Sequence, residues 1–287
     1  MEHDVLERIQ EAIPSFSKGQ KKIASYILEN YDKTAFMTAG KLGTTVGVSE
    51  STVVRFAADI GFEGYPEMRK ALQALIKNRL TSVQRIEVAK GLMNAAAIPS
   101  SVLTADMERI HATLETMPSS DFDAAADALC KAKSIYIMGM RSSNAIAIYM
   151  GHYLNMLFPN VRVVNESSSS EVFEQILRVD EGDVFIGISF PRYSRRTIRA
   201  MEYAGGRGAK VIAITDTDSS LLAQTADLRL YAKSDMISFV DSIAAPMSLA
   251  SALIVAAANR SGEDLTQDFA RLEKIWSELG VYEKTAR

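Results

Sequence analysis

The feature that most constrains the fold is a set of short, almost uninterrupted apolar runs in the C-terminal half of the sequence. The runs are rich in β-branched residues and occupy residues 134–138, 161–164, 183–188, 210–215 and 228–231. Segments with helical periodicity separate them. Buried strands that alternate with helices are typical of a parallel sheet with helices on both faces. We therefore predict a three-layer α/β/α domain with a five-stranded, mostly parallel sheet, closed by a long helix over residues 237–259.

The N-terminal part of the chain shows only helical periodicity. Pro14 ends a first helical segment, and Ser17 is placed to cap a second. A third segment begins near Thr38, breaks at residues 46–48 and restarts at Ser49. Because two helices around a short turn that contains glycine form a helix-turn-helix, we predict an all-α domain of this kind.

This change of pattern divides the chain into three predicted regions. Residues 1–77 form the helix-turn-helix domain, residues 78–120 a helical linker, and residues 121–287 the α/β domain. The linker is rich in alanine and methionine, and we expect its Ile-Pro-Ser-Ser sequence at residues 98–101 to interrupt it.

The composition excludes several classes of protein. A hydrophobic content of 47% with 23% charged residues is typical of a folded, soluble chain, and a net charge of −3 argues against indiscriminate coating of nucleic acid. The single cysteine, Cys130, excludes an internal disulfide and a cysteine zinc site, and we interpret it as a core residue. Three scattered histidines lack the spacing of metal ligands, so we expect no metal and no cofactor. We expect no signal peptide, because residues 1–4 have neither a basic region nor an apolar core. The longest uncharged apolar run, residues 247–258, is shorter than the ~20 residues that span a bilayer. We expect a cytoplasmic protein without a membrane partner.

The helix predicted to follow Ser49 has one apolar and one polar face. Its apolar face is formed by Val53, Phe56, Ala57 and Ile60. We predict that the opposite side contacts DNA through Ser49, Glu50, Ser51, Thr52 and Arg55. Hydroxyl groups suit phosphates or base edges, and an arginine suits a guanine edge or a phosphate. A helix pair with a merely solvated polar face would show the same pattern. However, residues 17–80 carry ten basic and six acidic side chains, a surplus that favours DNA.

The sequence around this helix resembles the DNA-binding domain of the MurR/RpiR family of transcriptional regulators. Residues 48–56 read Val-Ser-Glu-Ser-Thr-Val-Val-Arg-Phe and residues 60–66 read Ile-Gly-Phe-Glu-Gly-Tyr-Pro, close to the family pattern VSxxTVxRF followed by LGFxGYxE. The chain departs from the family at Gly40 and Gly43, where better helix formers are usual. Each glycine costs about 1 kcal/mol relative to alanine, so we expect that helix to depend on tertiary packing.

Ligands of parallel sheets bind beyond the C-terminal ends of the strands, so the segments that follow the predicted strands are candidate sites. Residues 139–144 form a small turn into a helix, where backbone N–H groups with Ser142 and Ser143 suit a phosphate. The glycine spacing of a dinucleotide loop is missing, so we do not expect NAD. Residues 189–197 combine three arginines with two serines and one threonine, which suits an anion, although a solvated basic loop is an alternative. For residues 165–171 a polar helix cap and a ligand contact are equally compatible with the sequence.

Residues 121–260 resemble the sugar isomerase (SIS) domain, which follows the DNA-binding domain in RpiR regulators. The resemblance implies a phosphosugar ligand whose phosphate is held by loop hydroxyl groups. The expected effector-binding residues are Ser142, Ser143, Ser189, Arg192, Ser194 and Thr197. The usual loop pattern is S-x-S-G-x-T, whereas this chain inserts Pro191-Arg192-Tyr193 and has Arg195 in place of the glycine. Such a loop could hold phosphate through arginine side chains or accept a different anion.

A SIS domain can act as an isomerase, a sensor or a structural scaffold. Isomerisation needs a base, usually a carboxylate, often with a histidine acid, and Glu166, Glu171 and His152 are the candidates. His152 lies in an apolar helix, which favours a packed or interface role. A fused DNA-binding domain favours a sensor, because ligand binding then only needs to shift a conformational equilibrium. We predict a regulator that is not an enzyme, with a sugar-phosphate isomerase as the alternative.

We expect this regulator to be a repressor of genes of carbohydrate metabolism. Its predicted partners are double-stranded operator DNA, a small phosphorylated sugar and further copies of itself in a homodimer or homotetramer. Paired recognition helices would read inverted half-sites about one helical turn (~34 Å) apart, or a multiple of that.

Overall fold

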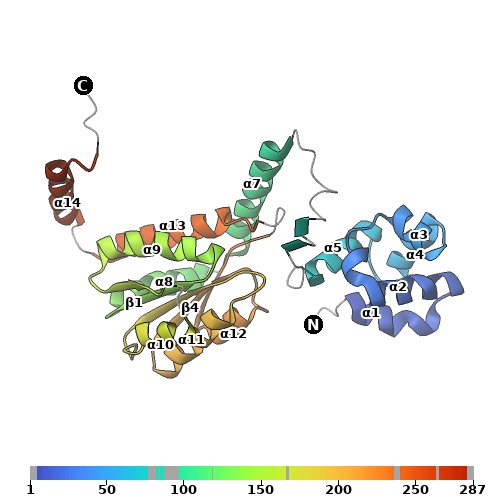
Figure 1. Ribbon diagram of the computed structural model, residues 1–287, viewed down its shortest axis with the longest axis horizontal. Helices are drawn as coiled ribbons and strands as arrows, with labels where there is room; N and C mark the ends of the chain where they lie inside the picture. Colours follow the sequence, from blue (N-terminus) through green and yellow to red (C-terminus); the bar gives the residue numbers. More distant parts are fainter. Residues whose placement is uncertain are drawn as a thin grey trace. The chain divides into compact units, whose positions relative to one another are not determined.

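In the computed structural model the chain forms two compact units (Figure 1). One unit comprises Met1–Ile98 with Met236–Val240, and the other comprises Pro99–Asp235 with Asp241–Arg287. The structure describes residues 5–76, 82–83, 85–86, 97–117, 119–165, 168–235, 240–262 and 265–282.

The N-terminal unit is helical, as predicted. Its elements are α1 (Val5–Ala12), a 3-10 turn (Ile13–Ser15), α2 (Lys18–Thr34), α3 (Ala39–Val46), α4 (Glu50–Asp59) and α5 (Tyr65–Ile76). The predicted helix starts are confirmed by their caps: Ser17 forms a capping box with Gln20, while Thr38 caps α3 and Ser49 caps α4. Apolar side chains from all five helices form one core.

The turn between α3 and α4 explains Gly43, one of the two glycines that depart from the family pattern. Gly47 ends α3 with φ at 72°, the left-handed conformation that favours glycine. A Cβ on Gly43 would lie 2.8 Å from the carbonyl oxygen of Val48, so only glycine lets the turn pack this closely on α3. A Cβ on Gly40 would instead meet the flexible Glu50 side chain at 3.1 Å.

The second unit contains the predicted five-stranded sheet. The strands are β1 (Ile135–Gly139), β2 (Val161–Val163), β3 (Val184–Ile188), β4 (Lys210–Thr215) and β5 (Leu228–Tyr231). Their order is β2-β1-β3-β4-β5, and every neighbouring pair is parallel. The helices are α7 (Ile98–Thr116), α8 (Ser119–Lys131), α9 (Ser142–Leu157), α10 (Ser169–Gln175), α11 (Arg195–Gly206), α12 (Leu221–Thr225), α13 (Ala244–Arg260) and α14 (Leu265–Leu279).

Helices cover both faces of this sheet, which gives the predicted three layers (Figure 1). On one face Ile137 and Ile186 pack with apolar side chains of α8, α9 and α13. On the other face Tyr136 and Phe185 pack with side chains of α10, α11 and α12. Successive strand residues therefore serve opposite cores, which is why the central strands β1 and β3 are apolar throughout. Cys130 packs against the first of these cores, as interpreted from the sequence.

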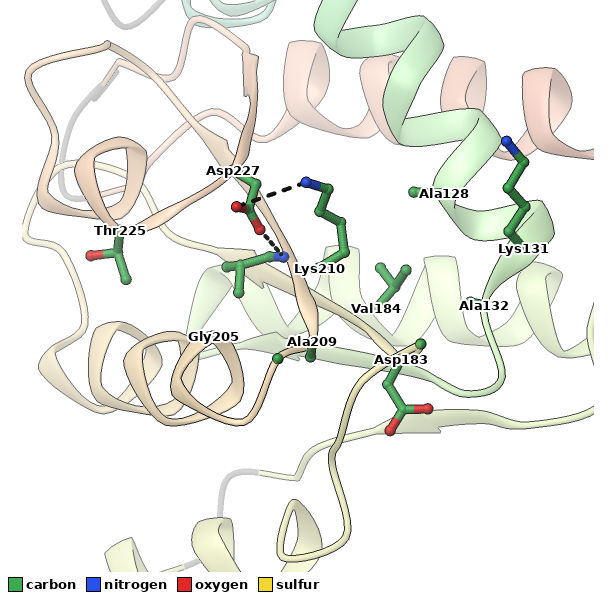
Figure 2. A pocket seen from close by; sticks show the side chains of 13 residues that line it. Ala128, Lys131, Ala132, Asp183, Val184, Gly205, Ala209, Lys210, Thr225 and Asp227 are labelled. Carbon is green, nitrogen blue, oxygen red and sulfur yellow. Dashed lines mark hydrogen bonds and ion pairs between the residues drawn. The ribbon is translucent and has the colours of Figure 1, made fainter.

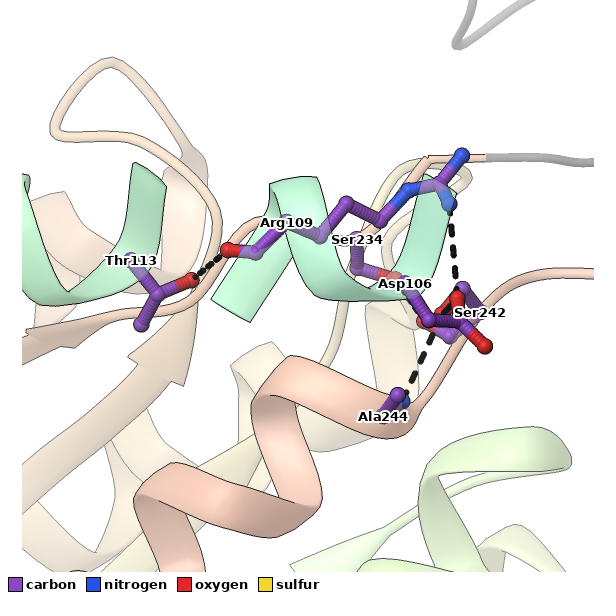
Figure 3. A network of polar contacts seen from close by, with 6 residues as sticks. All are labelled: Asp106, Arg109, Thr113, Ser234, Ser242 and Ala244. Carbon is purple, nitrogen blue, oxygen red and sulfur yellow. Dashed lines mark hydrogen bonds and ion pairs between the residues drawn. The ribbon is translucent and has the colours of Figure 1, made fainter. Parts of the chain in front are cut away.

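Two predicted helix limits were wrong, and α14 was not predicted. The closing helix begins at Ala244 and not at residue 237, because Ser242 is engaged elsewhere: its hydroxyl donates to Asp106 of α7 (2.5 Å), and its carbonyl accepts from Ser234 (2.8 Å) (Figure 3). Residues 236–239 lie outside the described part. Residues 98–101 do not interrupt a helix but begin α7, where a proline near the start is tolerated.

Within the described ranges, no helix is both long and apolar enough to cross a membrane.

Candidate functional site

The start of α4 gathers the hydroxyl groups predicted to contact DNA. The Ser49 side chain accepts a hydrogen bond from the Thr52 backbone N–H (3.3 Å). Ser49 Oγ also lies 2.8 Å from both Ser51 Oγ and Thr52 Oγ1. Three hydroxyl groups are thus held at a helix N-terminus, where the backbone favours a negatively charged ligand.

The two charged residues predicted on this surface are oriented differently. Arg55 is exposed and, among the described residues, has no ion-pair partner. The Glu50 carboxylate lies over Gly40 of α3. The structure therefore leaves Arg55 accessible to DNA and places Glu50 against the preceding helix.

The sheet order creates a second candidate site, at the C-terminal edge between β1 and β3. In the order β2-β1-β3-β4-β5 the chain leaves β1 toward one face and β3 toward the other, because α9 and α11 contribute to opposite cores. Such a switch point is where open α/β sheets bind ligands. The paired residues Gly139 and Ile188 end these two strands, so the two predicted effector loops begin side by side.

The loop after β1 is tightly built. A Cβ on Gly139 would lie 2.3 Å from the Ser143 carbonyl oxygen, so the turn into α9 requires glycine. Arg141 has φ at 57°, which is uncommon for a residue with a side chain. Ser142 is exposed, whereas Ser143 is only 5% exposed. Of the two predicted serines, Ser142 is the more accessible to a ligand.

The loop after β3 links three of the predicted residues. Ser189 Oγ accepts a hydrogen bond from the Ser194 N–H (3.0 Å), and Ser194 Oγ caps α11 by accepting one from the Thr197 N–H (3.2 Å). Thr197 is fully buried, yet its Oγ1 has no hydrogen-bond partner in the described structure. A buried hydroxyl normally has a partner. This group at the first turn of a helix is therefore suited to donate to a bound anion.

One of the three inserted residues, Tyr193, forms a pair with Asp216 that sequence reasoning missed. The Tyr193 hydroxyl donates a hydrogen bond to Asp216 Oδ1 (2.7 Å), directly after β4. Burial, reinforced by the Asp216 charge, raises the pKa of the Tyr193 phenol well above its usual value. Burial also raises the pKa of Asp216. The predicted Arg192 lies beside this pair, exposed and with φ at 73°. The position of Asp216 after a parallel strand was the available signal in the sequence.

The other candidates lie apart or outside the description. His152 is exposed on α9, and its ring centroid is 4.9 Å from that of Tyr153. Glu171 is exposed in the first turn of α10, while Glu166 is not among the described residues. Over the described ranges, no group of three or more His, Cys, Asp or Glu side chains could hold a metal ion.

A cavity in the second unit lies at the opposite, N-terminal edge of the sheet (Figure 2). It lies beside the start of β3 at Val184 and the start of β4 at Lys210. Asp227 there pairs with Lys210 (3.8 Å) and accepts a hydrogen bond from the Val211 N–H (2.8 Å). These contacts tie β4 to the segment before β5, so this cavity is separate from the predicted effector loops.

Comparison with known proteins identifies two family domains in this chain. The helix-turn-helix domain of the rpiR family matches residues 3–79, and the SIS domain matches residues 128–256. The HTH-type transcriptional regulator HexR of Pseudomonas aeruginosa is 27% identical over 76% of this chain and 75% of its own length.

The solved structures that are similar to this chain include the following two. The sugar isomerase domain of an RpiR transcription factor from Sphaerobacter thermophilus is 29% identical, covers 62% of this chain and 99% of its own, and has a TM-score of 0.59. The Vibrio vulnificus NanR protein, complexed with ManNAc-6P, is 19% identical, covers 96% of this chain and 98% of its own, and has a TM-score of 0.58.

Proposed function

Because the chain belongs to the RpiR family of DNA-binding transcriptional regulators, we propose that it represses genes of carbohydrate metabolism under the control of a small phosphorylated sugar. In this proposal residues 1–77 bind operator DNA, residues 121–287 bind the effector, and residues 78–120 link the two. The buried Thr197 hydroxyl without a partner carries the effector half of the proposal.

The DNA half rests on α4. Its cluster of Ser49, Ser51 and Thr52 hydroxyl groups suits a phosphate, and the exposed Arg55 suits a guanine edge or a phosphate. We assign Glu50 to the rim of this surface, since its carboxylate lies over α3.

The effector half rests on the switch point between β1 and β3. An anion at the N-terminus of α11 would accept a hydrogen bond from the Thr197 hydroxyl, which lies next to Ser189 and Ser194. Ser142 and Ser143 at the start of α9, and Arg192 on the inserted loop, complete the proposed site. The NanR complex supports this ligand class, since a protein of the same fold holds ManNAc-6P.

We propose that the effector is bound and not turned over. His152 contacts Tyr153 on an exposed helix surface, and the carboxylate at the edge of the sheet, Asp216, is engaged by Tyr193. The relative HexR is named as a regulator. A SIS-type isomerase remains the second candidate function because the fold is shared with such enzymes.

A gel-shift assay with the promoter of its own operon, with and without phosphosugars, tests both halves. Arg55→Ala should abolish operator binding and leave phosphosugar binding intact; loss of both would indicate misfolding.

The effector site is tested by two further variants. Ser189→Ala and Thr197→Ala should bind the operator but no longer respond to the effector. Normal responses in both variants would refute the pocket, and turnover of a phosphosugar would favour the isomerase.

We propose that the protein forms a homodimer or homotetramer, supported by an apolar stripe on α7. Its members recur at helical spacing and are exposed by 64, 63, 40 and 69%: Leu103, Met107, Ile110 and Leu114. An exposed stripe of this length often marks an interface. Light scattering should show a smaller assembly for Leu103→Asp/Leu114→Asp than for the wild type, and an unchanged mass would remove α7 from the interface.

A further inference from the structure

The N-terminal unit contains a basic groove that lies outside the predicted recognition surface. One wall is a face of α2, and the other is the C-terminal end of α3. The lining residues are Lys18, Lys21, Lys22, Ser25, Tyr26, Glu29, Thr45 and Val46. The six residues from α2 recur at spacings of three and four, so they form one continuous stripe along that helix.

The charge of this groove is unbalanced. Lys18, Lys21 and Lys22 are exposed, and none has an ion-pair partner among the described residues. Glu29 is the acidic member of the lining. It lies roughly 16 Å along the helix axis from Lys18, about twice the screening length in physiological salt. The N-terminal end of the groove therefore keeps its positive charge.

The groove is fixed next to α4 by two contacts of α2. Gly19 faces the start of α4: a Cβ there would lie 3.7 Å from the Thr52 methyl group. The Gln20 side-chain amide donates a hydrogen bond to the Asp59 carboxylate at the other end of α4. These two contacts hold α2, which carries the lysines, against the recognition helix.

We propose that this groove binds the phosphate backbone of the DNA duplex beside the bases that α4 reads. The inference rests on the proposed DNA-binding function and extends it to α2. Lysine ammonium groups with serine and tyrosine hydroxyl groups are the usual donors to phosphate oxygens, and all are present in the lining. Contacts of this kind position the protein on DNA without distinguishing sequences.

The salt dependence of DNA binding tests this inference. The logarithm of the affinity falls with the logarithm of salt concentration by about 0.9 for each phosphate that is neutralised. Lys18→Gln/Lys21→Gln/Lys22→Gln should therefore reduce this slope by up to about 2.7. It should weaken binding to the promoter duplex and to a random duplex of equal length by the same factor. Circular dichroism checks that the variant remains folded.

Lys33→Gln is the matched control, because Lys33 is an exposed lysine of α2 outside the groove. Its slope should equal that of the wild type. Two results would overturn the groove assignment. One is an unchanged salt-dependence slope in the triple variant. The other is a reduction of the slope in Lys33→Gln that equals the reduction per lysine in the triple variant. Failure of the proposed function has a different signature: the wild type would show no preference for its promoter over the random duplex.

Discussion

At the scale of a single side chain, a substitution of Thr197 can show whether its hydroxyl binds a ligand or stabilises the fold. Its buried hydroxyl has no partner in the described structure, which costs a protein about 1–3 kcal/mol. Thr197→Val keeps the shape and removes the hydroxyl. We therefore expect a free energy of unfolding equal to the wild type or higher by about 1 kcal/mol, measured by urea denaturation. Calorimetry with inorganic phosphate should show weaker binding.

Ser194→Ala provides the contrast to that variant. Ser194 caps α11, so its removal should lower the free energy of unfolding by about 1 kcal/mol and also weaken phosphate binding. A comparable loss of stability in Thr197→Val would show that the Thr197 hydroxyl stabilises the fold and is not reserved for a ligand.

Asp216 should make stability depend on pH in an unusual direction. Because burial raises the pKa of Asp216, the contribution of this residue to stability is greatest below the ordinary carboxyl pKa of about 4 and is lost as pH rises through the raised value. Asp216→Asn can still accept the Tyr193 hydrogen bond but has no charge to desolvate. We expect its advantage in thermal stability to be absent near pH 4 and to grow toward pH 7.

Tyr193→Phe is the control for this pH dependence. It keeps the buried carboxylate and removes its hydrogen-bond donor, so it should be less stable than the wild type at pH 7. If Asp216→Asn were also less stable than the wild type at pH 7, the charged Asp216 side chain would be stabilised by a partner other than Tyr193.

At the scale of helices, Gly40 and Gly43 are predicted to respond oppositely to the same substitution. Gly40→Ala meets only a flexible glutamate and should gain up to about 1 kcal/mol from helix propensity. Gly43→Ala would push its Cβ against the backbone of Val48, so it should destabilise the N-terminal unit and reduce operator binding. Thermal unfolding and gel shifts of the two variants measure this difference. Equal stabilities would show that the turn can open.

Most elements could be predicted because their signals are local. Strands were marked by β-branched runs, and helix starts by capping residues such as Ser17 and Ser49. The start of α13 could not be predicted, because Ser242 is drawn out of the helix by Asp106, 136 residues away. No side chain of α14 is buried, so the sequence offered no packing pattern that would require it.

The candidate site was predictable to a similar degree. The serines after β1 and β3 were predicted from their position at the ends of parallel strands. The Tyr193–Asp216 pair depends on the meeting of two loops, and the unpartnered state of Thr197 depends on what surrounds it. Neither property is encoded in a local pattern.

At the scale of the whole chain, hydrogen bonds lead from the effector edge to α7, the first helix of the second unit. The backbone carbonyl of Thr215, next to Asp216, accepts a hydrogen bond from the Ala232 N–H (2.8 Å). The neighbouring Lys233 N–H donates a hydrogen bond to the Thr113 hydroxyl of α7 (2.9 Å). Further along α7, Asp106 accepts from Ser242 and from Arg109 (Figure 3). Because α7 follows the predicted DNA-binding domain in sequence, we expect these contacts to couple the two predicted sites.

We expect Asp106→Ala to bind operator and phosphosugar separately but to lose the effect of one on the other, because coupling requires a shared change of state. Gel shifts across an effector titration measure this, with Glu108→Ala, an exposed change on the same helix, as the control. A full effector response in Asp106→Ala would limit the network to a structural role.

The core of the helix-turn-helix unit and the two cores of the α/β unit have no residue in common. A mutation in the core of the helix-turn-helix unit therefore removes no side chain from either core of the α/β unit. During evolution, we therefore expect DNA specificity and effector specificity to change through separate mutations. For engineering, we expect that the α/β unit can be joined to a different DNA-binding domain, provided that α7 is kept with the α/β unit.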